Sequence, residues 1–275
     1  MKKNMDIDTV ESFGDEWSRF DQSALSEVEA DRMFNEYFAV FPWDKLPENA
    51  TGFDMGCGSG RWAKLMASRV GHLHCIDPSS AIDVARKALA GANNVTFHQA
   101  SVDAHPLSVE NQDFGYSLGV LHHVPDSAAA LRACVAMLKP GAPFQLYLYY
   151  AFDNRSLAFK LVWRCSDLLR RAVCMLPATL KHLMTDSLAV VVYYPLARLS
   201  LLLERMGLAV ASIPLSYYRN HSFYTMRTDS RDRFGTPLEH RFSRKEIAEM
   251  MDTAGLGDVR FSERAPYWCA VGIKR

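Results

Sequence analysis

The sequence lacks the features of a secreted or membrane-spanning protein. Its six cysteines include no C-x-x-C pair and fall mostly within expected helices and strands, which predicts a reduced, cytosolic compartment and no disulfide scaffold. No apolar segment typical of a signal peptide follows Met1. The longest apolar run, Leu188–Ala197, is too short to span a bilayer and contains Pro195. We therefore expect a cytoplasmic protein and no integral membrane protein.

Net charge is also absent, because Lys+Arg and Asp+Glu each number 31 among the 275 residues. A neutral chain without a basic appendage argues against a nucleic-acid partner. No internal repeat or low-complexity tract is visible. Hydrophobic residues make up 49% of the chain and charged residues 23%, which suffices for the core of one large α/β domain with an insertion, or of two small domains.

The chain has no G-x-x-x-x-G-K-[ST] motif, which excludes a phosphate-binding P-loop, and no metal site is predicted. It does contain a glycine-rich stretch, Phe53–Gly60, with glycines at alternate positions 56, 58 and 60. An apolar run precedes the glycines and a helical spacing of apolar residues follows them. This order predicts a strand, a tight turn and a helix, whose backbone N–H groups face a bound small molecule.

Strand and helix patterns alternate regularly from residue 51 to residue 150. Alternating strands and helices favour a parallel sheet that binds its ligand at the carboxyl ends of the strands. We expect strands over 51–55, 72–76, 95–99, 113–120 and 144–149, and helices over 61–70, 80–89 and from the cap residue Asp126 to 138.

The flanking segments differ from this pattern. Residues 1–50 predict one or two helices, rich in aromatic residues. In the segment 151–240 we expect helices over 157–175 and 184–206, the second interrupted by Pro195, and a polar loop over 217–237. A capping box at Ser243–Glu246 opens a further helix, and strands over 257–263 and 267–274 suggest a terminal antiparallel hairpin.

Acidic residues lie near the ends of the first three strands: Asp54 at the end of the first, before the glycine turn, and two others after the second and third. The G-x-G-x-G spacing differs from the dinucleotide fingerprint G-x-G-x-x-G. Asp77 ends the second strand, where a carboxylate accepts hydrogen bonds from both hydroxyls of a ribose, and Asp103 follows the third strand, within reach of an adenine amino group. The pattern therefore favours a nucleoside ligand and disfavours a nicotinamide dinucleotide.

Five motifs in order resemble the class I S-adenosylmethionine-dependent methyltransferases over roughly residues 50–149. They are the stretch 54–60, Asp77, Asp103, the stretch 117–124 after the fourth strand, and Leu138–Gly141 before the fifth. The resemblance implies an α/β, Rossmann-like sheet of seven strands, the last antiparallel, with helices on both faces and a mostly helical insertion. We expect a helical lid over 1–49, the cofactor-binding core over 50–150, an acceptor cap over 151–240, and a helix and hairpin over 241–275 that complete the core.

The resemblance also implies residues that bind S-adenosylmethionine. The glycine turn would lie under the methionine portion and the ribose, with Asp54 near the amino group. The nucleoside would meet Asp77 and the neighbours of Asp103, and Trp17 either covers the site against water or only packs. The predicted cofactor-binding residues are Asp54, Gly56, Cys57, Gly58, Gly60, Asp77, Pro78, Val102, Asp103, Leu118, Gly119 and Trp17.

Candidate catalytic residues are histidines and a tyrosine. Methyl transfer is chiefly a positioning task, and an oxygen or protonated amine acceptor must also lose a proton. His122 and His123 follow the fourth strand, and His221 and Tyr224 lie in the insertion. For each of them the alternative is a local packing or hydrogen-bonding role.

The sequence thus predicts an enzyme that methylates an O, N or C atom of a small molecule, such as a sugar, an aromatic or polyketide-like metabolite, or a lipid head group. The alternatives are an inactive cofactor-binding partner subunit and, less favoured, an NAD-type oxidoreductase. The basic amphipathic stretch 160–171 leaves peripheral membrane contact open; packing on its own domain is the simpler interpretation.

Overall fold

The computed structural model describes residues 4–275, so the first three residues of the predicted lid segment lie outside the described residues. The chain divides into two compact units. The sheet unit comprises residues 4–22, 30–151 and 238–275. The helical unit comprises residues 23–29 and 152–237.

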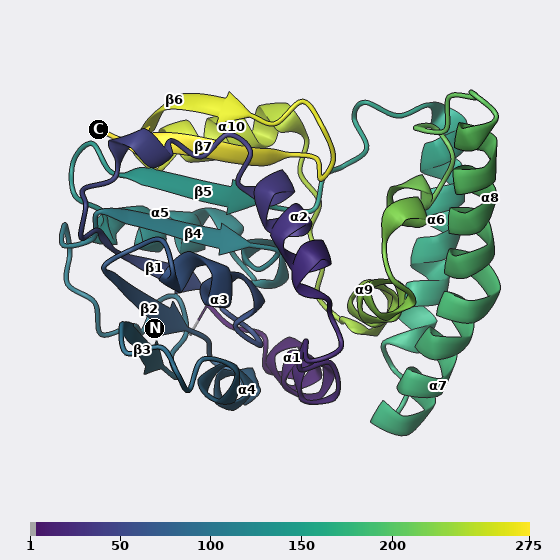
Figure 1. Cartoon of the computed structure of the whole chain (residues 1–275), viewed down its shortest axis with the longest axis horizontal. Coiled ribbons are helices and arrows are strands. Elements are labelled where there is room, and N and C mark those ends of the chain that lie inside the picture. Colours follow the sequence, from purple (N-terminus) through teal and green to yellow (C-terminus); the bar gives the residue numbers. More distant parts are fainter. Residues whose placement is uncertain (1–3) are drawn as a thin grey trace. The chain divides into compact units, whose positions relative to one another are not determined.

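A seven-stranded sheet forms the centre of the sheet unit (Figure 1), in the order β3-β2-β1-β4-β5-β7-β6. Strands β1 to β5 are parallel, and β7 runs antiparallel between β5 and β6. The predicted Rossmann-like sheet with an antiparallel last strand is confirmed. The strands are β1 Thr51–Met55, β2 His72–Ile76, β3 Val95–His98, β4 Phe114–Leu118, β5 Pro143–Tyr147, β6 Leu256–Phe261 and β7 Cys269–Lys274.

Two hydrophobic layers enclose the sheet because successive side chains of a strand point to opposite faces. Phe53 and Phe144 pack with residues of α5 and α10 in one layer, whereas Phe114 and Tyr116 pack with residues of α2 and α3 in the other. The helices of this unit are α1 Ile7–Arg19, α2 Glu27–Tyr37 (which begins in the helical unit), α3 Arg61–Ala67, α4 Ala81–Ala88, α5 Ser127–Met137 and α10 Arg244–Thr253, with short 3-10 helices η1 Trp43–Lys45 and η2 Leu121–His123.

The predicted caps of two helices are confirmed. Asp126 accepts a hydrogen bond from the Ala129 N–H at 2.8 Å and opens α5. Ser243 and Glu246 form the reciprocal capping box of α10. These local signals are visible in sequence because a cap needs only residues within one helical turn.

The helical unit contains one element that the sequence pattern concealed. The segment 217–237 is not a loop, as predicted, but 3-10 helix η4 Ser216–Asn220 and helix α9 Phe223–Gly235. Ser222 caps α9 by accepting a hydrogen bond from Thr225 N–H. The buried face of α9 carries polar residues such as Thr225, Thr228, Ser230 and Arg231, so α9 lacks the apolar stripe by which an amphipathic helix is recognised.

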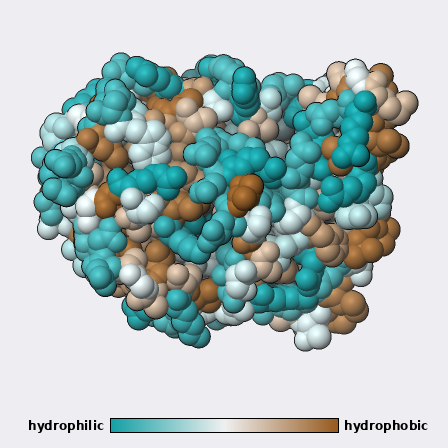
Figure 2. All heavy atoms as spheres, in the orientation of Figure 1, coloured by the Kyte–Doolittle hydropathy of each residue, from teal (hydrophilic) through white to brown (hydrophobic). Residues whose placement is uncertain are grey.

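The predicted interruption at Pro195 is also wrong. Helices α7 Ala178–Leu188 and α8 Tyr194–Arg205 are joined by a π-helical turn, η3 Ala189–Tyr193, into one continuous helix. The π turn accommodates the proline, which lacks an N–H. This 28-residue helix is long and apolar enough to cross a membrane, and 22% of its most apolar window is buried. Figure 2 shows hydrophobic side chains gathered where Figure 1 labels α7 and α8.

Helix α6 Leu157–Val173 completes the helical unit. It agrees with the predicted helix over 157–175 apart from its last two residues. Its apolar side chains, however, do not cover its own unit, since Leu161 and Leu168 are exposed whereas Asp167 and Arg170 are buried.

Candidate functional site

The glycine turn connects β1 to α3. Gly56, Gly58 and Gly60 have φ angles of 81°, 51° and 80°, values that favour residues without a Cβ. The N–H groups of Gly56 and Cys57 donate to the Ile76 carbonyl at 2.7 and 3.1 Å. A Cβ at Gly56 would lie 2.4 Å from the methyl groups of Val120. The turn therefore requires glycine for both its conformation and its packing.

Asp77 follows β2 and holds the turn in place. Its Oδ2 accepts from the Gly58 N–H at 2.9 Å, and its Oδ1 accepts from the backbone N–H and the hydroxyl of Ser79 at 2.8 and 2.6 Å. Burial raises the pKa of Asp77, and these hydrogen bonds oppose that effect. Three of about four lone-pair positions are used, which leaves room for one further donor. Ser79 was not predicted, although Asp-x-Ser is typical of a turn closed by its own side chains.

Asp54 lies in β1 directly before the turn and is 1% exposed. Its Oδ2 has no hydrogen-bond partner among the described residues. Burial raises the pKa of Asp54 to about 8; the nearby Tyr116 hydroxyl opposes this rise and the nearby Asp77 carboxyl adds to it. The Tyr116 hydroxyl is itself buried and, like Asp54 Oδ2, has no hydrogen-bond partner among the described residues. A buried carboxyl oxygen without a donor is unfavourable, so this position suits a ligand that brings an N–H group or a positive charge.

The predicted adenine end of the site contacts the N-terminal segment. Asp103 accepts from the Ser101 hydroxyl at 2.7 Å through Oδ1 and from the Asn4 backbone N–H at 2.9 Å through Oδ2. The Asn4 side chain also donates to the carbonyl of Asp126. Both carboxyl oxygens of Asp103 thus already accept hydrogen bonds, one of them from a residue 99 positions away that sequence could not pair with it.

The remaining predicted cofactor residues border the same edge of the sheet. Val102 and Leu118 are buried, and Pro78 is half-buried beside Asp77. A Cβ added to Gly119 would meet no heavy atom within 4 Å, so the backbone after β4 borders open space. Burial raises the pKa of the Cys57 thiol well above its usual value, which keeps it protonated and fits a packing role in the turn.

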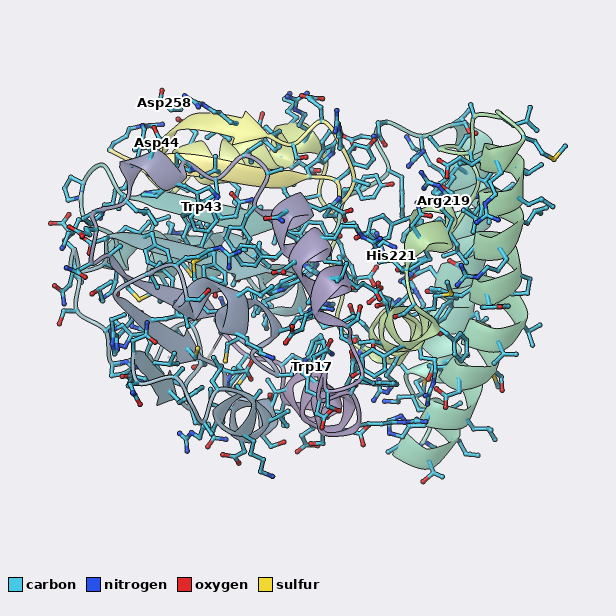
Figure 3. The ribbon with its side chains drawn as sticks, viewed as in Figure 1. Trp17, Trp43, Asp44, Arg219, His221 and Asp258 are labelled. Atoms are coloured by element: carbon cyan, nitrogen blue, oxygen red, sulfur yellow. The ribbon has the colours of Figure 1, made fainter. Side chains whose placement is uncertain are left out.

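Helix α1 covers the glycine turn. The Trp17 side chain (Figure 3) lies 3.1 Å through its Nε1 from the position of a Cβ on Gly58. A Cβ at Gly14 would similarly meet the Ser80 hydroxyl at 2.5 Å. The buried side of α1 is unusually polar, with Thr9, Ser12 and Glu16 at most 7% exposed. The structure therefore brings Trp17 to the predicted cofactor site.

His122 and His123 lie in η2, after β4, and stack with Tyr149. The two imidazole rings are 4.0 Å apart, and the ring of Tyr149 lies 3.9 Å from that of His122. Nδ1 of His122 accepts from the Tyr149 N–H at 3.4 Å. Burial, with neighbouring His123, lowers the pKa of His122 well below its usual value. His122 is therefore neutral with its proton on Nε2, and it can donate a hydrogen bond there.

His123 has the opposite tautomer. Its Nδ1 lies 2.6 Å from the Leu238 carbonyl, which can only accept, so Nδ1 carries the proton and Nε2 of the neutral ring carries the lone pair. Phe13 of α1 contacts the ring edge-on at 5.0 Å. Of the two histidines, His123 is the one oriented to accept a proton.

The other two catalytic candidates belong to the helical unit. His221 precedes α9, is 5% exposed, and holds its ring against Tyr217 through an Nδ1 contact of 3.0 Å to the Tyr217 carbonyl. Tyr224 is half-buried in the first turn of α9. The four candidates thus divide into two pairs, one in each unit.

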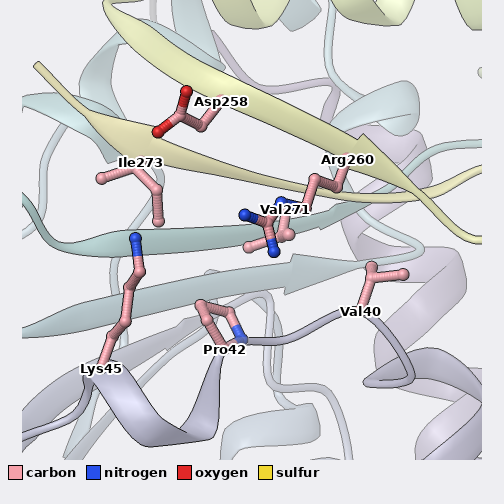
Figure 4. Close-up of a pocket in the computed structure, with 7 residues that line it drawn as sticks. All are labelled: Val40, Pro42, Lys45, Asp258, Arg260, Val271 and Ile273. Carbon is pink, nitrogen blue, oxygen red and sulfur yellow. The ribbon is translucent and has the colours of Figure 1, made fainter.

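A small surface hollow lies elsewhere in the sheet unit (Figure 4). It lies between η1 and strands β6 and β7, and its lining combines apolar residues such as Val271 with the charged Lys45, Asp258 and Arg260. It contains none of the predicted site residues.

Comparison with known proteins shows similarity between part of the sheet unit and methyltransferases. Residues 53–145 match a family profile described as a methyltransferase domain. Ubiquinone biosynthesis O-methyltransferases from Serratia proteamaculans and Marinobacter nauticus are 32% and 37% identical to this chain over 109 and 108 residues. Each match covers 38% of this chain and 44% of the relative. The chain therefore spans less than half the length of these curated relatives.

Solved structures agree with the fold. An O-methyltransferase family protein from Burkholderia thailandensis superposes with a TM-score of 0.53 at 13% identity, covering 94% of this chain and 59% of that one. A phosphoethanolamine N-methyltransferase of Haemonchus contortus, solved with phosphomonomethylethanolamine and S-adenosylhomocysteine, gives 0.50 at 15% identity, covering 92% and 46%. At these identities the similarity concerns the fold alone.

Proposed function

We propose that this chain, whose residues 53–145 match a methyltransferase-domain profile, is a class I S-adenosylmethionine-dependent methyltransferase that transfers a methyl group from S-adenosylmethionine to a small-molecule acceptor. One observation carries the proposal: Asp54 and Asp77 flank a glycine turn that only glycine can form, and Asp54 Oδ2 lacks a donor. Oxygen is the favoured acceptor atom, because the curated relatives are named as O-methyltransferases. Nitrogen and carbon are the alternatives.

The residues present fit the cofactor. Asp54 would hold its amino group, the remaining lone-pair position of Asp77 would accept from a ribose hydroxyl, and Trp17 would cover the turn. Asp103 would contribute less than Asp77, because Ser101 and Asn4 already use both of its oxygens. When bound, the cofactor supplies a methyl group on a positively charged sulfur.

The histidine pair supplies the proton chemistry that an acceptor hydroxyl requires. Nε2 of His123 would accept the hydroxyl proton, while the Leu238 carbonyl holds the ring in the required tautomer. Nε2–H of His122 would donate a hydrogen bond that orients the acceptor, because a histidine with so low a pKa is a weak base. The polar buried side of α1 and the Trp17 ring would limit the entry of water.

Isothermal titration with S-adenosylmethionine and S-adenosylhomocysteine tests the binding half of this proposal. We expect Asp77→Asn to weaken both ligands by about 10- to 100-fold, since a charge-assisted hydrogen bond is lost. Asp83→Asn is the matched control, because Asp83 is an exposed residue of α4 six positions after Asp77 in the chain. Failure of the unmodified protein to bind either ligand, or unchanged binding by Asp77→Asn, would overturn the proposal.

Turnover separates the enzyme from the inactive-subunit alternative. Mass spectrometry of a metabolite extract incubated with the protein and S-adenosylmethionine should reveal acceptors with added methyl mass. We expect His123→Ala to lower the rate while cofactor affinity is retained. His72→Ala should leave the rate unchanged, because His72 begins β2 and so lies at the edge of the sheet opposite the carboxyl ends of the parallel strands. Cofactor binding without any methylated acceptor would support the inactive subunit, and binding of NAD in place of S-adenosylmethionine would revive the oxidoreductase.

A further inference from the structure

The continuous helix α7–η3–α8 presents its apolar side chains outward. Its exposed side includes Leu183, Val191 and Leu202, at 65%, 70% and 56% exposure. A helix on the surface of a protein in water has the reverse arrangement, with its apolar stripe toward the core. The residues buried along this helix are instead polar or mostly small, and every one is at most 8% exposed: Lys181, Thr185, Ala189, Tyr193, Ala197 and Ser200.

Helix α6 repeats this inverted arrangement. Leu161 and Leu168 are 63% and 68% exposed, whereas Asp167 and Arg170 are 9% and 7% exposed. The buried pair is internally satisfied, because Arg170 Nε donates to Asp167 at 2.7 Å and its NH1 donates to the Thr236 carbonyl at 2.9 Å. The polar side of α6 is therefore turned into its own unit and the apolar side away from it.

Polar interactions also hold the rest of this interior together. Arg227 of α9 forms a two-fold contact with Asp186 of α7 at 3.1 and 3.0 Å, and the Ser230 hydroxyl donates to the Thr185 carbonyl at 2.8 Å. A small apolar cluster around Val173 and Met226 accompanies them. Apart from Ser200, whose buried hydroxyl has no hydrogen-bond partner among the described residues, the named polar groups are paired inside, and leucine and valine lie outside, which is the arrangement an apolar environment favours.

The exposed apolar residues are concentrated in this segment of the chain. Among the described residues, 22 large hydrophobic side chains are exposed, and seventeen of them lie between positions 157 and 208. Scattered exposed hydrophobics are common, but a contiguous set of this kind marks an interaction surface. Figure 2 shows such residues along the edge formed by α7 and α8.

On the exposed surface of the same helices, positively charged residues outnumber negatively charged ones. The three acidic residues between 157 and 205 are each ion-paired to arginine: Asp167 to Arg170 and to the exposed Arg171, Asp186 to Arg227, and Glu204, whose side chain is 40% exposed, to Arg219. Exposed charges on these helices are the arginines at 164, 171 and 205. The surface therefore combines apolar side chains with positive charge, which matches an anionic lipid headgroup region above acyl chains.

We propose that α6 and α7–α8 dock the helical unit onto an anionic phospholipid leaflet, with their apolar sides in the interfacial layer. The 28-residue helix has the length to cross a bilayer, but its inner side carries Lys181 and Thr185 against its own unit, so it lies along the surface. A second copy of the chain is a weaker occupant, because apposing two such surfaces would bring their exposed arginines together. Docking would hold the chain beside acceptors dissolved in the leaflet, a consequence that rests on the proposed function.

Vesicle co-sedimentation tests the docking directly. The full chain should pellet with vesicles of phosphatidylcholine and phosphatidylglycerol, much less with phosphatidylcholine alone, and less at high salt. Val191→Glu should reduce the partition coefficient by about tenfold or more, because it places a charge in the apolar layer. Val109→Glu is the matched control, since Val109 is 72% exposed in the sheet unit against 70% for Val191.

A second pair of variants isolates the electrostatic part. Arg164→Glu changes two charge units near the lipid surface and should weaken binding to anionic vesicles by about 30-fold. Arg132→Glu makes the same change on an exposed residue of α5 in the sheet unit and should have little effect. Circular dichroism should be unchanged in all four variants, because each altered side chain is exposed.

The outcomes are distinct. Absence of pelleting with either vesicle, or equal loss in Val191→Glu and Val109→Glu, would overturn the inference. So would sedimentation-equilibrium evidence of a lipid-free dimer that Val191→Glu dissociates, since the occupant would then be a second copy. Titration of each variant with S-adenosylmethionine separates this result from the proposed function, because docking variants should retain cofactor binding.

Discussion

The buried carboxyl of Asp54 predicts that cofactor binding releases a proton. With the pKa raised to about 8 by burial, the group is about 90% protonated at pH 7 in the free protein. A cationic amino group placed at the unpartnered Oδ2 favours the carboxylate. Binding at pH 7 should therefore release most of one proton from Asp54. At pH 9 Asp54 is already ionised and the ligand's amino group, with a usual α-amino pKa of about 7.7–8.0, must gain a proton to bind as a cation, so net proton uptake is expected there.

The same pKa predicts how affinity and stability depend on pH. Affinity for S-adenosylmethionine should rise by up to about tenfold per pH unit below pH 8, as Asp54 ionises, and fall again above pH 8, as the ligand's amino group loses its charge. The stability of the free protein changes in the opposite sense. The pKa of Asp54 in the folded protein lies above its usual value of about 3.9, so the free energy of unfolding is highest at low pH, where the buried carboxyl is neutral, and falls as pH rises from 4 to 8. At pH 7 the cost of burying Asp54 is about 4 kcal/mol.

Asp54→Asn removes the titration while it keeps the shape of the side chain. We expect it to raise the melting temperature at pH 8 and to leave it nearly unchanged at pH 4, while it weakens cofactor binding about 10- to 100-fold at pH 8. Titration calorimetry in buffers of different ionisation enthalpy measures the released proton, and 5′-methylthioadenosine, which lacks the amino-acid portion, is the control ligand. Equal proton release by Asp54→Asn, or by the control ligand, would refute the reasoning.

Three further predictions follow from contacts around the sheet. Gly56→Ala should lower the free energy of unfolding by about 1–3 kcal/mol and abolish cofactor binding, because the φ of Gly56 is 81° and the added methyl would meet Val120. As the control in the same titration, Gly91→Ala should bind the cofactor normally, because its added methyl would meet no other heavy atom within 4 Å. Cofactor binding should change tryptophan fluorescence through the ring over Gly58, and a signal that persists in Trp17→Phe would contradict this placement. Burial, with neighbouring histidines, lowers the pKa of His74 to about 4, so thermal stability should fall as pH drops from about 6.5 to 4, and His74→Asn should flatten that decline.

Rules that involve only residues close together in sequence are sufficient to predict the elements of the sheet unit. A glycine turn, the caps at Asp126 and Ser243, and alternating strand and helix patterns depend on residues close in sequence, and the strand order follows from the rules of parallel crossovers. The helical unit followed these rules less well. Helix α9 cannot be recognised from its sequence pattern because its buried face is polar, and the continuity of the helix through Pro195 cannot be predicted because a π turn leaves no sequence signal.

The sequence by itself determined the type of fold and the positions of the acidic residues near the ends of the strands. Only the tertiary structure decided how those residues are used: Asp54 keeps an unpartnered oxygen, Asp77 is largely satisfied by Ser79, and Asp103 is occupied by Asn4. It also decided that the leucines of α6 and α8 face outward. Spacing shows which residues share a face, but burial and hydrogen bonding depend on contacts between residues far apart in the chain.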